Sequence, residues 1–271
     1  MPSASHPIAT SSRPVVLCLS GHDPSGGAGL QADSEALLAQ GCHAAPAVTV
    51  LTVQNTESVS DIQALDGDWV LAQVEKVIQD LPIAAIKLGI LGSLAILETV
   101  LQIRQWLPDV PLVCDPVLQA GGGGALSKDD LTQAIRDQLL PVCTIATPNL
   151  PEARRLAALP DGDADACAEQ LLSRVPWLLI TGGHSEDAEV ENRLYSRDGL
   201  RQRFSCPRLP GGYHGSGCTL ASALAGRLAL GETPVGAAER ALNYTWRTLR
   251  DAETLGKGQY VPRRLPLDFC N

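Results

Sequence analysis

A short segment, residues 213–220, has residue types that could bind an anion and move a proton. It reads Tyr-His-Gly-Ser-Gly-Cys-Thr-Leu, and the small and apolar residues after it predict that it opens a helix. Gly215 and Gly217 allow the backbone to turn its N–H groups inward around an anion, and a helix N-terminus adds about half a positive charge there. The Cys218 thiol at that position is expected to have a lowered pKa. From these residues alone, a glycine-rich turn before a buried cysteine stays open as the alternative.

A second glycine-rich segment lies between the first expected strand and the first expected helix. Residues 21–29 contain four glycines but match neither the GxGxxG nor the Walker pattern. Composition alone does not separate a ligand-binding loop from an ordinary surface loop. The glycines at 121–124, two residues after Gln119, are likewise compatible with a phosphate-facing flap or with a flexible turn.

An amide and two carboxylates form a third set. Asn149 and Glu152 are three residues apart at an expected helix start, so they share one helix face. Together with Asp115, which ends an expected strand, they could hold Mg²⁺, an ion that takes few protein ligands and keeps several waters. The alternatives are a capping box formed by Asn149 and Glu152, and a turn-forming role for Asp115.

These segments must be positioned by a repeated pattern of short apolar runs and amphipathic stretches. The runs predict strands at 14–20, 44–53, 84–87, 111–114, 144–146 and 177–180, and the stretches predict helices at 29–40, 68–79, 94–106, 129–139, 217–230 and 234–250. A hairpin is expected from 191–195 and 202–206, around Asp198-Gly199. The alternation predicts an α/β fold with a mainly parallel sheet covered on both faces. Ligands bind beyond the carboxyl ends of such strands, where the polar turns lie.

Composition narrows the class of protein. The chain has 271 residues, of which 45% are hydrophobic and 19% charged, so a sizeable core is available. A net charge of −9 without a basic run excludes a nucleic-acid partner, because phosphate neutralisation needs clustered cations. No apolar stretch reaches the roughly 18 residues of a membrane span.

Cysteine usage and the chain start add two expectations. Eight cysteines are too dilute for a disulfide scaffold, and no CxxC pattern suggests zinc, so most are expected to be small buried residues in a reducing cytoplasm. Residues 1–13 are rich in Ser, Pro and Ala and are expected to form a disordered tail. Residues 14–271 are expected to form a single domain.

Taken in order, these segments resemble the hydroxymethylpyrimidine/phosphomethylpyrimidine kinases of the ribokinase-like superfamily. The likeness is carried by residues 21–33, 53–56, 87–91, 115–117, 147–153, 182–184 and 214–219. The resemblance implies a three-layer α/β/α sandwich. It also implies ATP- and Mg²⁺-dependent phosphorylation of 4-amino-5-hydroxymethyl-2-methylpyrimidine, and of its monophosphate, in thiamine biosynthesis, by a homodimer.

The same resemblance implies the roles of individual residues. Cys218 would be the catalytic base, and the amides of Gly215, Ser216 and Gly217 would hold the transferring phosphoryl group. The carboxamide of Gln54 would read the pyrimidine edge in two hydrogen bonds. The pyrimidine pocket would be lined by Gly21, Ala28, Asp33, Thr52, Ile90 and Val117. The nucleotide would be bound by Asn149, Thr181 and His214, and Mg²⁺ by Asp115 and Glu152.

Three departures from the family pattern leave other functions open. Thr181 stands where a lysine is common, the segment 119–124 carries no lysine, and Thr52 replaces a usual valine. Because phosphoryl transfer depends on charge stabilisation, the missing cations put efficiency in doubt, above all for the second phosphorylation. The alternatives are a pyridoxal or pyridoxine kinase, which Cys218 disfavours because those enzymes typically carry aspartate there, and a pyrimidine-binding regulator without turnover.

Overall fold

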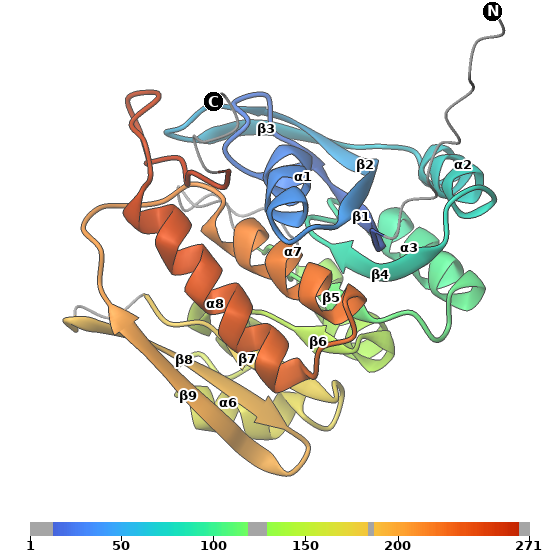
Figure 1. Ribbon diagram of the computed structural model, residues 1–271. Coiled ribbons are helices and arrows are strands. Elements are labelled where there is room, and N and C mark those ends of the chain that lie inside the picture. Colours follow the sequence, from blue (N-terminus) through green and yellow to red (C-terminus); the bar gives the residue numbers. More distant parts are fainter. Residues whose placement is uncertain (1–12, 119–128, 184–186, 266–271) are drawn as a thin grey trace, which may run out of the picture.

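Nine strands form one sheet at the centre of the computed structural model, which describes residues 13–118, 129–183 and 187–265 (Figure 1). They are β1 Val15–His22, β2 His43–Gln54, β3 Val59–Ala64, β4 Ile83–Leu88, β5 Leu112–Cys114, β6 Ile145–Ala146, β7 Trp177–Ile180, β8 Glu189–Ser196 and β9 Gly199–Pro207. Their order across the sheet is β3-β2-β1-β4-β5-β6-β7-β8-β9. Strands β2, β1, β4, β5, β6 and β7 run parallel, and β3, β8 and β9 add antiparallel edges.

Helices cover both faces of the sheet. On one face lie α1 Gly29–Ala39, α7 Ser216–Ala229 and α8 Pro234–Arg250, and on the other lie α2 Gly67–Ile78, α3 Leu94–Trp106, α4 Asp129–Ala134, α5 Leu150–Ala157 and α6 Ala164–Leu171. Strand β1 shows why two layers are needed, since Val16 and Cys18 belong to one core cluster while Leu17 and Leu19 belong to the other. Successive side chains of a strand point to opposite faces, so an all-apolar strand must be buried on both. The expected three-layer α/β/α sandwich is confirmed.

The expected elements match the structure except at three places. Strand β3 was not expected because Ser60, Asp61 and Gln63 make it a polar edge strand. Helix α6 was also not expected. The helix expected over 129–139 ends as an α-helix at Ala134 and continues as a π-helical turn, Ile135–Leu139, ahead of Pro141, which has no N–H for an α-helical hydrogen bond.

Several expectations fall on residues that the structure does not describe. Residues 1–12 of the expected tail, the segment 119–124 and His184 lie outside the described ranges. The cysteines within those ranges are free thiols, and most of them are buried. No helix in the described part of the chain is long and apolar enough to cross a membrane.

Candidate active site

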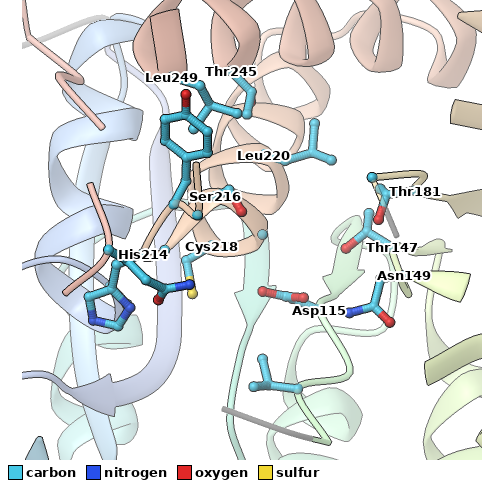
Figure 2. Close-up of a pocket in the computed structure, with 18 of the residues that line it drawn as sticks. Asp115, Thr147, Asn149, Thr181, His214, Ser216, Cys218, Leu220, Thr245 and Leu249 are labelled. Carbon is cyan, nitrogen blue, oxygen red and sulfur yellow. The ribbon is translucent and has the colours of Figure 1, made fainter. Parts of the chain in front are cut away.

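A cavity of about 510 Å³ opens where the parallel strands end. Its size lies in the range of small-molecule sites. The structure brings to it the predicted residues Gly21, Ala28, Thr52, Gln54, Ile90, Asp115, Val117, Asn149, Glu152, Thr181, His214, Gly215, Ser216, Gly217 and Cys218. Gln54 and Cys218 therefore face one cavity although 164 positions of sequence separate them. Figure 2 shows Cys218 between His214 on one side and Asp115 on the other.

Asp33, which the resemblance places in the pyrimidine pocket, is the exception, because it does not line the cavity. Helix α1 turns it into the core, where it has no exposed surface. It forms an ion pair of 2.8 Å with Lys87 and accepts a hydrogen bond of 2.7 Å from Ser222. Asp33 is therefore part of a buried network behind the cavity wall.

Lys87 is a buried cation whose importance the residue pattern did not reveal. It also donates a 2.8 Å hydrogen bond to Ser20 Oγ. Although burial disfavours its charge, the Asp33 carboxylate raises the pKa of Lys87 above its ordinary value. The available signal was a lysine inside the apolar strand β4, because a buried charge requires a partner. Lys87 acts electrostatically on Cys218 and Asp115, which places a fixed positive charge behind the cavity.

The glycine loop after β1 is folded around one carboxylate. Asp23 accepts hydrogen bonds from the N–H and hydroxyl of Ser25, at 2.8 and 2.7 Å, and from the N–H of Ala28 at 2.8 Å. Its other contact is the His214 imidazole, at 2.7 Å. Burial opposes ionisation, but the hydrogen bonds from His214 and Ser25 outweigh it and lower the pKa of Asp23 to about 2. An ordinary surface loop is therefore the wrong interpretation, and the imidazole of His214 is engaged by the protein itself.

The start of α7 has the geometry expected of an anion site. Gly215 is its N-cap with a φ of 74°, a left-handed conformation suited to glycine, and no side chain in the described ranges caps the helix. A Cβ added to Gly217 would lie 3.7 Å from both carboxylate oxygens of Asp115. The open N–H groups of the first turn thus lie close to the carboxylate that ends β5.

The Cys218 thiol, however, does not have the lowered pKa expected from its place on a helix N-terminus. Burial raises the pKa of Cys218 to about 12, and the attraction of Lys87 and a hydrogen bond from the Gly29 N–H only partly offset this. Asp115 and Asp33 raise it further. The expectation failed because desolvation and two carboxylates outweigh the fields that favour a thiolate.

Asp115 lies close enough to Glu152 to change its pKa. Burial raises the pKa of Asp115 to about 6, with Lys87 opposing the shift. Burial and then the charge of Asp115 raise the pKa of Glu152 to about 8. A bound cation would stabilise the anionic forms of these two buried carboxyl groups, whose pKa values burial raises.

Glu152 also forms the capping box. Asn149 accepts from the Glu152 N–H at 2.9 Å, and Glu152 accepts from the Asn149 N–H at 3.0 Å. Its other oxygen accepts from the Leu118 N–H at 3.4 Å. The capping interpretation is therefore correct, and the two carboxylate oxygens of Glu152 are each held by one backbone N–H.

Asp115 fits a cation better. Its Oδ2 is buried without a hydrogen-bond partner among the described residues, a state that normally costs free energy. Within the same ranges, no group of three or more His, Cys, Asp or Glu gathers as a metal site. Mg²⁺ would suit a carboxylate of this kind, since it takes one or two carboxylates and completes its shell with phosphate oxygens and water.

The far end of the cavity contains residues that the sequence did not single out. Leu220, Thr245 and Leu249 project from α7 and α8 across from Thr147 and Thr181 (Figure 2). The hydroxyl of Thr245 is buried and has no hydrogen-bond partner in the described part of the chain. Apolar walls with one or two unpaired polar groups are typical of a site for a flat heterocycle.

The structure shows the contacts of Thr52 and Thr181, two residues that depart from the family pattern. The hydroxyl of Thr52 donates to the His22 carbonyl at 2.9 Å, so the extra polar group is already paired. Thr181 forms a β-bridge with Asn149.

Arg208 lines the cavity and donates to the carbonyls of Asp187 and Gly183. The carbonyl of Gly183 that it contacts lies two residues after Thr181, the position where the family pattern commonly has lysine.

Comparison with known proteins points to one group of enzymes. A family model described as phosphomethylpyrimidine kinase matches residues 23–263. The hydroxymethylpyrimidine/phosphomethylpyrimidine kinase of Mycobacterium tuberculosis is 40% identical over 253 residues, which cover 90% of this chain and 91% of the relative. A pyridoxal kinase of Bacillus subtilis, solved as an ADP complex, superposes with a TM-score of 0.86 at 25% identity and covers 93% of this chain and 98% of its own. A phosphomethylpyrimidine kinase of Clostridium difficile superposes with a TM-score of 0.74 at 29% identity, covering 86% and 98%.

Proposed function

The chain belongs to the phosphomethylpyrimidine kinase family and is a phosphotransferase of thiamine biosynthesis, and from this premise we propose how its cavity performs the reaction. The proposed reaction transfers the γ-phosphoryl group of ATP to the hydroxymethyl group of 4-amino-5-hydroxymethyl-2-methylpyrimidine and then to its monophosphate. The observation that carries the proposal is that Gln54 and Cys218 line the same cavity as the uncapped start of α7.

The pyrimidine occupies the end of the cavity formed by β2 and the loop after β1. Gln54 ends β2, and its carboxamide offers one acceptor and two donors to the amino group and ring nitrogen of the heterocycle. Thr52, Ile90 and Val117 supply the walls, and Gly21 and Ala28 the backbone of the loop. A Cβ at Gly21 would lie 2.7 Å from Ile90, so glycine is needed for this close packing.

The nucleotide occupies the opposite end. Leu220 and Leu249 provide apolar surface for a purine, and the unpaired hydroxyl of Thr245 provides a hydrogen bond. The phosphates point to the first turn of α7, where the N–H groups of Gly215 to Cys218 receive no cap from any described side chain. The Bacillus subtilis neighbour was solved with ADP, which supports nucleotide binding in this fold.

Cys218 is the residue for proton transfer, and Asp115 is the residue for charge stabilisation through Mg²⁺. Asp115 would hold Mg²⁺ through its unpaired oxygen, with Glu152 and Asn149 fixing the neighbouring backbone. When bound, Mg²⁺ supplies positive charge that offsets the phosphates and the carboxylates. Burial raises the pKa of Cys218, and the carboxylates of Asp115 and Asp33 raise it further, whereas Lys87 and the Gly29 N–H lower it. In its thiolate form Cys218 accepts the proton of the hydroxymethyl group while that oxygen bonds to the γ-phosphorus, and the bond from the γ-phosphorus to the bridging oxygen breaks to release ADP.

Product analysis tests this proposal. Purified protein with ATP, Mg²⁺ and the hydroxymethylpyrimidine is expected to form the monophosphate and then the diphosphate, resolved by chromatography. Pyridoxal assayed in parallel is expected to turn over more slowly by at least tenfold. Tight pyrimidine binding without phosphate transfer would instead support the regulator, and preferred turnover of pyridoxal would support the other kinase.

The assembly and compartment are part of the same proposal. Leu51 and Val53, two residues apart on β2, are both exposed, and a second copy of the chain would cover this apolar strip in a homodimer. Light scattering after size exclusion tests it, and a monomer at micromolar concentration would exclude it. Free buried thiols fit the reducing conditions of the cytoplasm, where we place the enzyme.

A further inference from the structure

Arg264 is a fully buried cation at the end of the described chain. Its side chain has no exposed surface, and its guanidinium contacts three separate segments. It donates to Glu35 of α1 at 3.1 Å, to the hydroxyl of Thr219 at 2.8 Å and to the carbonyl of Gly27. Burying a guanidinium is costly unless its donors are paired, and only arginine offers a planar fork that reaches several acceptors.

Two of these partners belong to the two halves of the active site. Gly27 lies in the loop that Asp23 folds and that carries Ala28 to the pyrimidine end. Thr219 lies in the first turn of α7 and donates to the Gly215 carbonyl at 2.7 Å. One guanidinium therefore ties the pyrimidine-side loop to the phosphoryl-side turn.

Close packing shows that the two halves meet at this point. A Cβ added to Gly215 would lie 2.9 Å from the Cα of Ala28 and 2.9 Å from Nη2 of Arg264. A change in the guanidinium is thus transmitted to both segments at once, because interiors packed this tightly cannot absorb a shift.

The segment that carries Arg264 is itself anchored to α8. The Arg264 carbonyl accepts from the Tyr244 hydroxyl at 2.8 Å, and the N–H of Arg263 donates to the Thr248 carbonyl at 3.1 Å. Arg264 lies one position beyond residues 23–263, the part that the family model matches. The family match therefore says nothing about it.

We propose that Arg264 is a positioning residue that sets the separation between the loop holding the pyrimidine and the helix turn holding the phosphoryl group. The inference rests on the proposed function of these two segments. Each segment keeps its own ligand contacts without Arg264, but the hydroxymethyl oxygen and the phosphorus no longer meet at the reactive distance. The rate of such a transfer is sensitive to a displacement of about 1 Å between the reacting oxygen and phosphorus. The binding of each ligand alone does not depend on that separation.

The test compares two variants with a matched control. Arg264→Met is expected to lower kcat by 10- to 100-fold while KM for the pyrimidine and for ATP changes less than threefold. Arg264→Lys is expected to give an intermediate kcat, since a single ammonium cannot span three acceptors. Arg263→Met removes the same charge from the neighbouring position, which pairs with Glu253 near the surface, and is expected to keep kcat within twofold of the wild type.

Binding measurements separate positioning from general damage. Calorimetry with the pyrimidine alone, and with a non-hydrolysable ATP analogue alone, is expected to give near-wild-type affinities for the Arg264 variants. Thermal unfolding shows whether each variant is folded. If Arg264→Met does not fold, the comparison of Arg264→Lys with the wild type provides the test. A kcat within twofold of wild type in both Arg264 variants overturns the inference. So does a loss of affinity for each ligand as large as the loss of kcat. A loss of kcat in Arg263→Met equal to that in Arg264→Met overturns it as well. A wild-type protein without turnover would overturn the proposed function, and this inference with it.

Discussion

The Asp23 carboxylate contacts the His214 imidazole at 2.7 Å, across 191 positions of sequence, and joins the loop after β1 to the residue before the α7 turn. Gly27 packs directly under the same imidazole, since a Cβ there would overlap the ring. The loop that lines the pyrimidine end and the turn that lines the phosphoryl end are thus two sides of one hydrogen-bonded unit.

Removing the Asp23 charge is expected to loosen that unit. Asp23→Asn cannot accept all four contacts at once, because an amide has a single acceptor oxygen. We expect a loss of about 1–3 kcal/mol in the free energy of unfolding, and a fall in kcat/KM for the pyrimidine of at least tenfold. Denaturant unfolding and steady-state kinetics measure the two effects. Asp109→Asn, at an exposed position, is the control and is expected to change neither.

The same carboxylate predicts a pH dependence of stability. The pKa of Asp23 is lowered in the folded state to about 2, so its contribution is complete above the ordinary aspartate pKa near 4 and is lost as the pH falls toward 2. Between pH 5 and pH 2.5 the wild type is therefore expected to lose more stability than Asp23→Asn. Parallel stability curves for the two proteins over this range would contradict the assignment.

Replacing the proposed base should affect turnover far more than binding. Cys218→Ala is expected to lower kcat by about 100- to 10,000-fold and to change KM for either substrate by less than threefold. Cys167→Ala is the matched control, because Cys167 is buried in α6 on the opposite face of the sheet. Equal kcat values for Cys218→Ala and the wild type would remove the thiol from the mechanism.

The raised pKa of Cys218 also predicts its reactivity. With a pKa of about 12, the thiol of the ligand-free protein is almost fully protonated at pH 7.5. Alkylation of Cys218 by iodoacetamide, followed by peptide mass spectrometry, is expected to be at least tenfold slower than alkylation of free cysteine and to accelerate above pH 10. Rapid alkylation at neutral pH would show a thiolate and contradict the structure.

Dependence on Mg²⁺ should change near pH 6. The pKa of Asp115 is raised to about 6, so protonation competes with the cation below that pH. The Mg²⁺ concentration for half-maximal activity is expected to rise several-fold between pH 7 and pH 5.5, and Asp115→Asn is expected to raise it at least tenfold at pH 7. A requirement for Mg²⁺ that is independent of pH and unchanged in Asp115→Asn would place the cation elsewhere.

Local sequence determined most of the architecture, because the signals are local. The alternating burial of Val16, Leu17, Cys18 and Leu19 follows from one apolar run, and the predicted bounds of α3, β7 and α8 are those observed. The polar edge strand β3 was missed because its pairing with β2, and not its composition, makes it a strand.

The ordered motifs likewise identified most of the candidate site. Residues at the carboxyl ends of parallel strands meet at one edge of the sheet, so Gln54, Asp115 and Asn149 could be placed together from their positions alone. Cys218 opens a helix after an antiparallel strand, and only the family resemblance placed it at the same site. The same reasoning could not place Asp33, because only about half a turn of helix, roughly two residues, separates a side chain that faces the cavity from one that faces the core.

What only the tertiary structure decided are the contacts and charges between distant segments. The pairs Asp23–His214, Asp33–Lys87 and Gly27–Arg264 join positions far apart in the chain, and no spacing rule predicts them. The pKa of Cys218 was expected to fall and instead rises, since it depends on desolvation and on carboxylates brought close by the fold. Residue type and spacing determine which groups are available near a strand end, but burial and the nearest charges, which exist only after folding, determine their chemistry.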